Sequence, residues 1–316
     1  MKVLFLDSVH ECLVEGLFDL GYKCDFPVID NKKDVLDIIE NYEGLIVRSK
    51  MIIDREIIEK GEKLRFIGRP GAGMENIDVE FATGRGIACI NSPEGNRDAV
   101  GEHALGMILS LLNKINIADR EIRNGHWNRT SNRGVEIKDK TIGIIGFGNM
   151  GSSFAEKIQG LGAKIIAYDK YKKNYATRNV IETDLQTIFE ETDILSLHIP
   201  LTKETDYMIN NEFINSFKKN IYIINSARGK ILNTENLVEN LKKGKVLGAA
   251  LDVLEYEKTT FESLYKTTSP PAFQYLLESN KVILTPHVAG WTEQSYFKIS
   301  NVLLDKIKEL TQCLKS

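Results

Sequence analysis

The sequence has few cysteines, no polybasic block and no long apolar run, and each lack excludes a class of protein. Its four cysteines (Cys12, Cys24, Cys89 and Cys313) are scattered over 316 residues, without a Cys-x-x-Cys pair or a histidine cluster beside them. This spacing predicts neither a disulfide framework nor a metal site, and it favours reduced thiols in the cytoplasm. The longest apolar run, residues 104–112, is far shorter than the ~20 residues that a membrane-spanning helix needs.

The chain also lacks a large excess of positive or negative charge. With 41 basic and 44 acidic residues, the formal net charge is -3, and no Lys/Arg block stands out. Such a chain has no general attraction to nucleic acid or to an anionic membrane. The opening segment 1–7 is too brief for the apolar core of a signal peptide. We therefore expect neither nucleic acid nor membrane among its partners.

What the chain does have is a glycine loop that directly follows an apolar strand. Residues 141–145 lead into Gly146-Phe147-Gly148-Asn149-Met150-Gly151, and a helical pattern follows. Gly146 allows the tight turn, Gly148 has no Cβ to block a phosphate, and Gly151 lets helix and strand pack closely. The first amides of that helix suit an anion. The loop therefore predicts a dinucleotide pyrophosphate site, although glycines at an ordinary strand–helix turn are the alternative.

An acid at the end of the next strand bears on which dinucleotide binds. Residues 164–169 end in Asp169, roughly 20 residues beyond the loop, as expected for the ribose contact. A carboxylate there accepts hydrogen bonds from ribose hydroxyls and repels a 2′-phosphate, which favours NAD over NADP. Lys170, Lys172 and Lys173 follow at once and weaken that conclusion.

Strand and helix patterns alternate throughout, which predicts an α/β fold with parallel sheets covered by helices on both faces. Asp54 is the expected N-cap of a helix over 54–60. One long helix with an apolar stripe (Leu105, Ile108, Leu112, Ile115, Ile122) is expected from about 97 to a stop at Asn124-Gly125. The other predicted strands are 3–7, 23–26, 44–48, 65–68, 87–91, 193–199, 221–226, 247–253 and 282–285.

A final helix after residue 290 needs a partner for its apolar stripe (Tyr296, Ile299, Leu303, Ile307, Leu310). The first domain is the most economical partner, so we expect the chain to leave it near 97 and return near 290. Two doubly wound parallel-sheet domains result: a flavodoxin-like substrate domain (1–97 plus 290–316) and a Rossmann NAD-binding domain (98–289). We expect a cleft between them, because ligands of open parallel sheets bind outside the carboxyl ends of the strands.

Three strand ends of the second domain carry the groups that hydride transfer to a 2-oxo acid requires. Arg228 follows one strand, Glu257 stands beyond the next, and His287 follows the last. A guanidinium binds a carboxylate through two parallel hydrogen bonds, an imidazole transfers the hydroxyl proton, and a carboxylate orients the imidazole. Each also has a plainer interpretation: Arg228 as a cap of nearby carbonyls, His287 as a packed histidine, Glu257 as a surface acid.

With these motifs, and with 198–202, 225–229, 251–253 and 286–290, the chain resembles the D-isomer-specific 2-hydroxyacid dehydrogenases over its whole length. The resemblance implies Arg228 as the substrate-orienting cation, His287 as acid/base and Glu257 as its paired acid. It implies an NAD cofactor and, through the helix after Asp98, a homodimer. The implied cofactor-binding residues are Ala72, Gly146, Gly148, Asn149, Met150, Gly151, Asp169, His198, Ile199, Pro200, Ser226, Ala227, Arg228, Asp252, His287, Ala289 and Gly290, with Asp252 fixing the nicotinamide ring or its carboxamide.

The first domain most resembles the D-3-phosphoglycerate dehydrogenase branch, through 44–49, 67–73, 91–96 and 127–129. The guanidinium groups of Arg48, Arg69 and Arg129 suit a substrate phosphate, and the amides of Gly71, Ala72 and Gly73 suit the substrate carboxylate. Arginines that only face solvent or pair with acids are the alternative. With no regulatory domain after Ser316, we do not expect feedback by serine.

Two departures from the family pattern lie beside the paired acid. Lys258 replaces the usual proline after Glu257, and Glu255 is close enough to be mistaken for the paired acid. The segment 258–280 is longer than usual and aromatic, which suggests a lid or a dimer contact. The predicted function is NAD-dependent interconversion of a D-2-hydroxy acid and its 2-oxo acid. The favoured substrate is 3-phosphoglycerate. Unphosphorylated acids (glyoxylate, hydroxypyruvate, pyruvate) and an NAD(H)-sensing scaffold are the alternatives.

Overall fold

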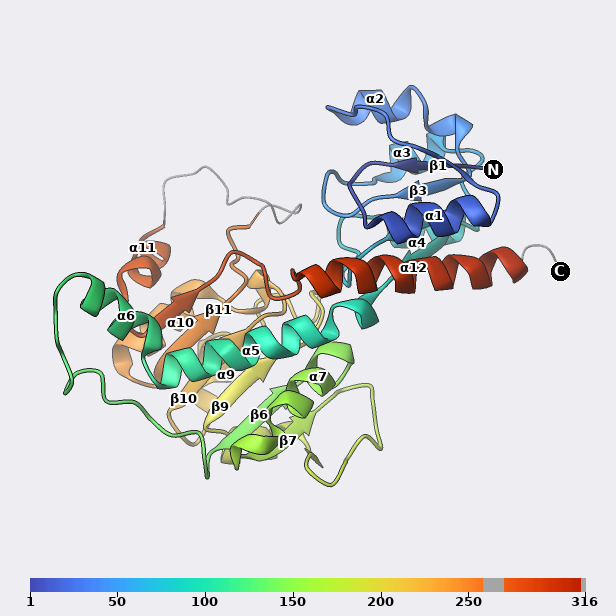
Figure 1. Cartoon of the computed structure of the whole chain (residues 1–316). Helices are drawn as coiled ribbons and strands as arrows, with labels where there is room; N and C mark the ends of the chain where they lie inside the picture. Colours follow the sequence, from blue (N-terminus) through green and yellow to red (C-terminus); the bar gives the residue numbers. More distant parts are fainter. Residues whose placement is uncertain (258–269, 314–316) are drawn as a thin grey trace. The chain divides into compact units, whose positions relative to one another are not determined.

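The computed structural model describes residues 1–257 and 270–313, which form two compact units, each built on one parallel sheet. Unit 1 holds residues 1–97, 257 and 291–313, and unit 2 holds 98–256 and 270–290 (Figure 1). No helix within the described ranges is both long and apolar enough to cross a membrane.

Unit 1 has five strands in the order β2-β1-β3-β4-β5, all parallel, which is the flavodoxin-like order that the sequence predicts. Helices cover both faces of this sheet. Its elements are β1 (Lys2–Phe5), α1 (Glu11–Asp19), β2 (Lys23–Asp25), α2 (Lys32–Leu36), η1 (Ile39–Asn41), β3 (Gly44–Ile46), α3 (Arg55–Lys60), β4 (Phe66–Arg69), α4 (Val79–Gly84), β5 (Ala88–Asn91), η2 (Pro93–Gly95) and α12 (Glu293–Cys313).

Alternate residues of the central strand divide the core of unit 1 into two layers. Val3 and Phe5 pack with α1 and α12, whereas Leu4 packs with α2, α3 and α4. Leu303 and Ile307 of α12 are completely buried in the first layer, so the final helix finds the partner that its apolar stripe predicts. Asp54 caps α3 as predicted, since its side chain accepts from the amide of Ile57 at 3.2 Å.

Unit 2 has seven parallel strands in the order β12-β11-β10-β9-β6-β7-β8, which is the Rossmann order with one further strand. Its elements are α5 (Arg97–Leu112), α6 (Ile115–Arg123), β6 (Thr141–Ile145), α7 (Asn149–Ile158), η3 (Gln159–Leu161), β7 (Lys164–Tyr168), β8 (Ile181–Glu182), α8 (Leu185–Glu191), β9 (Ile194–Leu197), α9 (Asn211–Ser216), β10 (Ile221–Asn225), η4 (Gly229–Ile231), α10 (Thr234–Lys243), β11 (Val246–Leu251), α11 (Pro271–Glu278) and β12 (Val282–Leu284).

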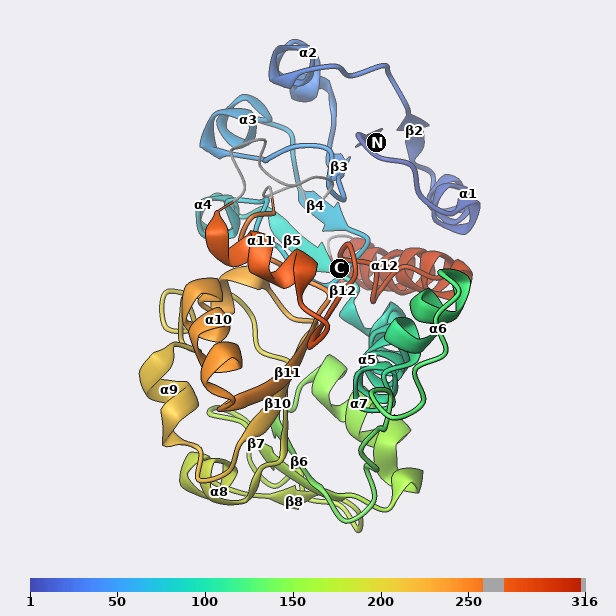
Figure 2. The ribbon, with the colours of Figure 1, turned by 90° about the vertical axis from the view of Figure 1, so that its left-hand side faces the viewer.

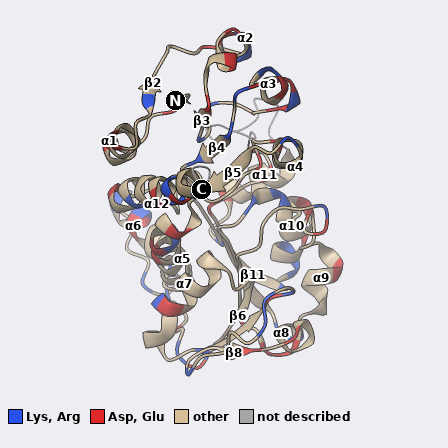
Figure 3. Cartoon of the chain, turned by 90° about the vertical axis from the view of Figure 1, so that its right-hand side faces the viewer, with Lys and Arg blue, Asp and Glu red and all other residues tan. Residues whose placement is uncertain are grey.

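Helices α5 and α7 cover one face of the second sheet, and α8 to α11 cover the other (Figure 2). The strands β6 and β11 carry no charged residue, whereas Lys, Arg, Asp and Glu gather on helices such as α8 and α10 (Figure 3). Of the long segment after 257, residues 258–269 lie outside the described part. Phe273 of α11 is only 8% exposed and packs against Tyr256 in the core of unit 2, with the ring planes tilted by 56°.

The prediction of one helix from 97 to 124 is wrong. The helix ends at Leu112, and α6 begins at Ile115 after Lys114, whose φ of 54° is left-handed and breaks the helix. The apolar stripe is therefore interrupted, and Ile115 and Ile122 are about half exposed, at 53% and 52%. The predicted stop is confirmed, because Asn124 caps α6 and Gly125 has a φ of 78°.

Candidate active site

The glycine loop of unit 2 has the geometry that a pyrophosphate site requires. Gly146 has a φ of 92°, and a Cβ there would lie 2.4 Å from the carbonyl oxygen of His198. A Cβ on Gly151 would lie 2.0 Å from the carbonyl oxygen of Gly146. Only a residue without a side chain fits at either position, so the loop and α7 pack closely.

Gly148 differs, because a Cβ there would meet nothing within 4 Å. Gly148 is also the N-cap of α7 and offers no side chain to the first amides of the helix, Asn149 and Met150 among them. These amides and the positive end of the helix dipole suit a phosphate anion. The residues present therefore fit the pyrophosphate of a dinucleotide.

The other predicted cofactor residues follow parallel strands of this same sheet. Asp169 follows β7, His198 to Pro200 follow β9, Ser226 to Arg228 follow β10, Asp252 follows β11, and His287 to Gly290 follow β12. Because carboxyl ends of parallel strands lie at one edge, the structure brings all of these residues to the edge that carries the glycine loop. The hydroxyl of Ser226 is buried and has no hydrogen-bond partner among the described residues.

His198 is held as a neutral imidazole at this edge. Its Nε2 lies 2.8 Å from Ser196 Oγ, and its ring stacks obliquely on Phe154 of α7. Desolvation by burial lowers the pKa of His198 to about 3, so the ring carries no charge near neutral pH.

Asp252 organises the segment that carries His287. Its carboxylate is 1% exposed and accepts hydrogen bonds from the amides of Val288 and Ala289, each at 2.9 Å, and from the Thr285 hydroxyl at 2.6 Å. The amide of His287 donates to the Asp252 carbonyl at 2.7 Å. Both carboxylate oxygens are thus used within unit 2, and the predicted contact of Asp252 with nicotinamide stays a prediction.

His287 itself has a φ of 55°, a left-handed conformation that is unfavourable for a residue with a Cβ. The bonds to Asp252 offset that strain, because they hold the backbone on both sides of the imidazole. His103 of α5 completes the arrangement: its Nε2 lies 3.1 Å from Thr285 Oγ1 and 3.5 Å from Asp252 Oδ1. The contacts of His103 and Thr285 with Asp252 could not be predicted from the sequence, because nothing in their spacing links them to residue 252.

Arg228 follows the neighbouring strand and is held locally. Its Nη1 donates to the Ala227 carbonyl at 2.6 Å, and Asn225 binds both the Ala227 amide and the Arg228 carbonyl, at 3.1 and 3.0 Å. Packing requires glycine at position 229, because a Cβ there would lie 2.0 Å from the backbone of Leu254. The turn that presents Arg228 is therefore rigid.

The structure separates the two candidate acids. Glu255 lies beside Tyr207 and Tyr256; burial first, and then the charge of Glu255, raises the pKa of Tyr256 to about 12. The Glu255 carboxylate thus interacts with two tyrosines within unit 2. Glu257 is half buried and belongs to unit 1, so its pairing with His287 stays a prediction.

In unit 1, Arg48 is the best placed of the predicted substrate residues. Asp7 Oδ2 accepts the Arg48 amide at 2.7 Å, and the guanidinium lies 4.2 Å from the centre of the Trp291 ring. One terminal nitrogen, Nη1, is buried with no hydrogen-bond partner in the described ranges. A buried cationic donor of this kind suits an anionic ligand.

The other predicted substrate residues of unit 1 have structural partners. Arg69 is 6% exposed and donates from Nε to the Arg48 carbonyl at 3.0 Å and from Nη1 to the Gly73 carbonyl, so it braces the loop. The Gly71 amide donates to Ser92 Oγ at 3.1 Å, which leaves Ala72 and Gly73 to carry the predicted amide contacts. Arg129 is exposed in unit 2, in the segment between α6 and β6.

Comparison with known proteins agrees with this arrangement. Residues 105–289 match the family model described as D-isomer specific 2-hydroxyacid dehydrogenase, NAD binding domain. The chain is 38% identical over 280 residues to a hydroxypyruvate reductase of Thermotoga maritima, covering 88% of each protein. It is 35% identical over 313 residues to a D-3-phosphoglycerate dehydrogenase of Methanocaldococcus jannaschii, covering 98% of this chain and 57% of that protein.

Among solved structures, a D-lactate dehydrogenase of Aquifex aeolicus complexed with NAD and lactic acid superposes with a TM-score of 0.83 at 27% identity, covering 99% of this chain and 96% of that one. The chain spans little more than half the length of the curated D-3-phosphoglycerate dehydrogenases that it matches. The matched region contains the glycine loop, Asp169, Arg228, Asp252 and His287. The chain belongs to the D-isomer-specific 2-hydroxyacid dehydrogenase family, and residues 105–289 are its NAD-binding domain.

Proposed function

We propose that the chain interconverts a D-2-hydroxy acid and its 2-oxo acid with NAD as the redox partner. The observation that carries the proposal is the single sheet edge at which the pyrophosphate loop, Arg228 and the Asp252-braced His287 segment all lie. Bound NAD supplies the hydride acceptor, and reduced NADH supplies the hydride in reverse. The chain's own residues supply binding, orientation and proton transfer.

Arg228 binds the substrate carboxylate through its planar guanidinium and polarises the adjoining carbonyl. During oxidation, His287 accepts the proton of the C2 hydroxyl; during reduction, it returns that proton to the carbonyl oxygen. Glu257 would orient the imidazole of His287 through a hydrogen bond. The rigid turns at Gly229 and at Asp252 hold Arg228 and His287 before substrate arrives, which lowers the entropic barrier to reaction.

Replacing His287 with Ala tests this assignment. Turnover should fall at least ~100-fold, since general acid–base catalysis contributes that much or more. NADH binding, measured by nicotinamide fluorescence, should persist. His126, an exposed histidine of unit 2, gives the matched control, and H126A should keep its turnover. Turnover of H287A near that of H126A would remove His287 from the role.

For the substrate, we propose 3-phosphoglycerate and 3-phosphohydroxypyruvate. Relatives named D-3-phosphoglycerate dehydrogenase and the buried Nη1 of Arg48 support this choice. Arg48, Arg69 and Arg129 would hold the phosphate, and the amides of Ala72 and Gly73 the carboxylate. The relative named hydroxypyruvate reductase supports an unphosphorylated oxo acid as the second candidate.

NADH absorbance with a panel of 2-oxo acids separates the candidates. We expect phosphohydroxypyruvate to have the highest kcat/KM, and both R48A and R129A to raise its KM while leaving that for hydroxypyruvate unchanged. If both variants leave phosphohydroxypyruvate kinetics untouched, the unphosphorylated substrate is favoured. If no 2-oxo acid of the panel supports oxidation of NADH, the NAD(H)-sensing scaffold is favoured.

We also propose a cytoplasmic homodimer that forms through the region after Asp98. No residue of α6 is buried, and Ile115, Ile122 and Trp127 are 53%, 52% and 79% exposed. A cavity of about 210 Å³ is lined by residues of α5, α6, α11 and β12, including Leu111, Ile117 and Leu276. Apolar side chains gathered in this way favour coverage by a second copy of the chain.

A further inference from the structure

The ends of β7 and β9 lie on either side of the glycine loop. Both strands are hydrogen-bonded to β6, β7 on one side and β9 on the other, so the strand order reverses at β6. Nucleotides bind at such a switch point, outside the carboxyl ends of the strands. The residues that follow β7 and β9 therefore flank the adenosine half of a bound dinucleotide.

Asp169, after β7, is fixed as a carboxylate against the glycine loop. Its Oδ2 accepts from the Phe147 amide at 2.8 Å, and its Oδ1 accepts from the amides of Tyr171 and Lys172 at 3.0 and 2.9 Å. Burial opposes ionisation, but these three amides outweigh it and lower the pKa of Asp169. The acid predicted to bind ribose is thus charged and held by three hydrogen bonds.

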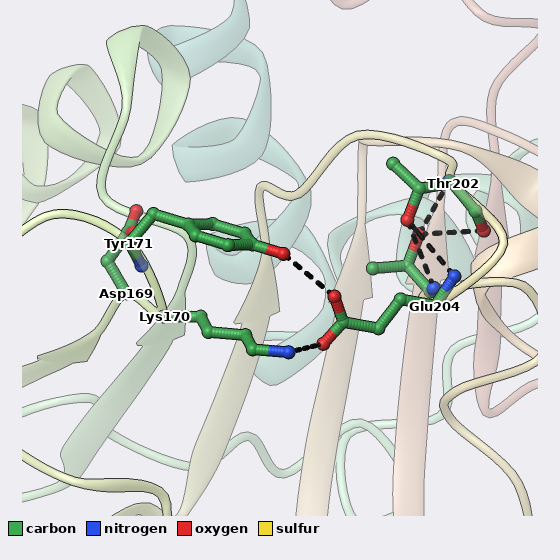
Figure 4. Close-up of polar contacts among 6 residues, drawn as sticks. Asp169, Lys170, Tyr171, Thr202 and Glu204 are labelled. Atoms are coloured by element: carbon green, nitrogen blue, oxygen red, sulfur yellow. Dashed lines mark hydrogen bonds and ion pairs between the residues drawn. The ribbon is translucent and has the colours of Figure 1, made fainter.

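Each of the three lysines that follow Asp169 has a partner of its own. Lys172 Nζ donates to the Phe147 carbonyl at 3.1 Å, and Lys173 Nζ donates to the Asp169 carbonyl at 3.4 Å. Of the three, only Lys170 forms an ion pair with a described residue, Glu204. Figure 4 shows Lys170 and Tyr171 reaching together from the end of β7 to the two oxygens of Glu204, where the Tyr171 hydroxyl donates at 2.8 Å.

Glu204 stands on a tight turn after β9 that is itself fixed by hydrogen bonds. Thr202 Oγ1 accepts the amide of Glu204 at 3.3 Å (Figure 4). It also accepts the amide of Thr205 at 3.3 Å, and Thr205 Oγ1 donates to the Pro200 carbonyl at 2.7 Å. The ion pair lowers the pKa of Glu204 and raises the pKa of Lys170, so both groups are charged. The Lys170–Glu204 bridge thus connects the two sides of the adenosine site.

We propose that Glu204 is a specificity-determining residue that favours NAD over NADP. Lys170 is the residue next to the ribose-binding acid, and its ammonium group would otherwise be a counter-ion for a 2′-phosphate. Glu204 engages that ammonium group and adds a second negative charge near Asp169. A 2′-phosphate then meets two carboxylates and no unpaired cation from Lys170. The inference rests on the proposed use of NAD, because it requires a dinucleotide on the glycine loop.

The test compares NADH and NADPH dissociation constants, measured by nicotinamide fluorescence on the full chain. In E204Q, the amide keeps an acceptor for Tyr171 but releases Lys170, so the NADPH/NADH affinity ratio should rise about 2- to 5-fold, as expected for one exposed ion pair. The gain should shrink at high salt, since exposed charges are screened. Adding K170M to E204Q should remove the gain.

Glu191 provides the matched control, because it pairs with Lys164 at the amino end of the same strand, β7. E191Q should leave the affinity ratio unchanged. An unchanged ratio in E204Q with normal NADH binding would overturn the inference and leave the proposed function intact, as would a gain that persists in the double variant. Failure of the unaltered chain to bind NADH would instead overturn the proposed function, and the inference with it.

Discussion

The buried imidazole of His198 makes the stability of the protein depend on pH. In the folded chain the pKa of His198 is lowered to about 3, whereas the ordinary value is 6.5. Between these values the unfolded chain binds a proton that the folded chain does not. The free energy of unfolding should therefore fall by up to about 1.4 kcal/mol for each pH unit below 6.5, and this loss is absent above 6.5.

Urea unfolding at pH 5, 6 and 7.5 measures this dependence. In H198N the polar contact with Ser196 can persist but the proton uptake is lost, so the slope of stability against pH should flatten. H126N, which alters an exposed histidine of the same unit, should keep the slope of the unaltered chain. Equal slopes in the two variants would show that His198 does not titrate as its burial predicts.

At the level of single residues, the sequence identifies chemistry better than geometry. Gly146, Gly148, Gly151 and Asp169 could be predicted because their order along the chain reflects one local turn. Asp252 could not be understood in the same way, since its role depends on the path of the loop after another strand. For the same reason the sequence could not show that Arg69 braces the Arg48 loop, which only the folded backbone reveals.

The glycine loop gives a prediction at the level of a secondary-structure element. Gly151 and Gly148 are three residues apart but have different roles. In G151A the new methyl group would meet the Gly146 carbonyl oxygen at 2.0 Å, so the strand–helix packing should lose about 2 kcal/mol or more. In G148A the methyl group enters open space, so the melting temperature should stay unchanged while NADH affinity falls at least ~10-fold.

Thermal unfolding and fluorescence titration of both variants distinguish these effects. G84A is the control, because Gly84 of α4 also has open space around it and lies in unit 1. It should alter neither quantity. A G148A variant that binds NADH normally would contradict the position assigned to the pyrophosphate.

Most elements could be predicted because strands buried on both faces read as short apolar runs. Besides the two strands that flank the glycine loop, nine strands were predicted, and all nine lie within two residues of their observed ends. The two-residue strand β8 was missed, since it is too short to show a period. The break between α5 and α6 was missed because Lys114 has no sequence mark of a left-handed residue, unlike glycine or asparagine.

At the scale of the whole molecule, the exposed apolar side chains of α6 test the proposed dimer. Light scattering on a sizing column should give twice the 35.7 kDa chain mass for the unaltered protein and the chain mass for the double variant I115E/I122E. Two charges inside an apolar interface would be desolvated without partners. Phe18 of unit 1, 74% exposed, is the control, and F18E should remain a dimer. A double variant that stays dimeric would place the interface elsewhere.

The bonds between Asp252 and the segment 285–289 have an evolutionary consequence. Asn or Gly would relieve the left-handed backbone at position 287, but neither brings an imidazole, while Asp252 makes the strained histidine tolerable. Substitutions at 252 and 287 should therefore show epistasis: in a combinatorial library selected for turnover, tolerated changes at one position will depend on the identity of the other.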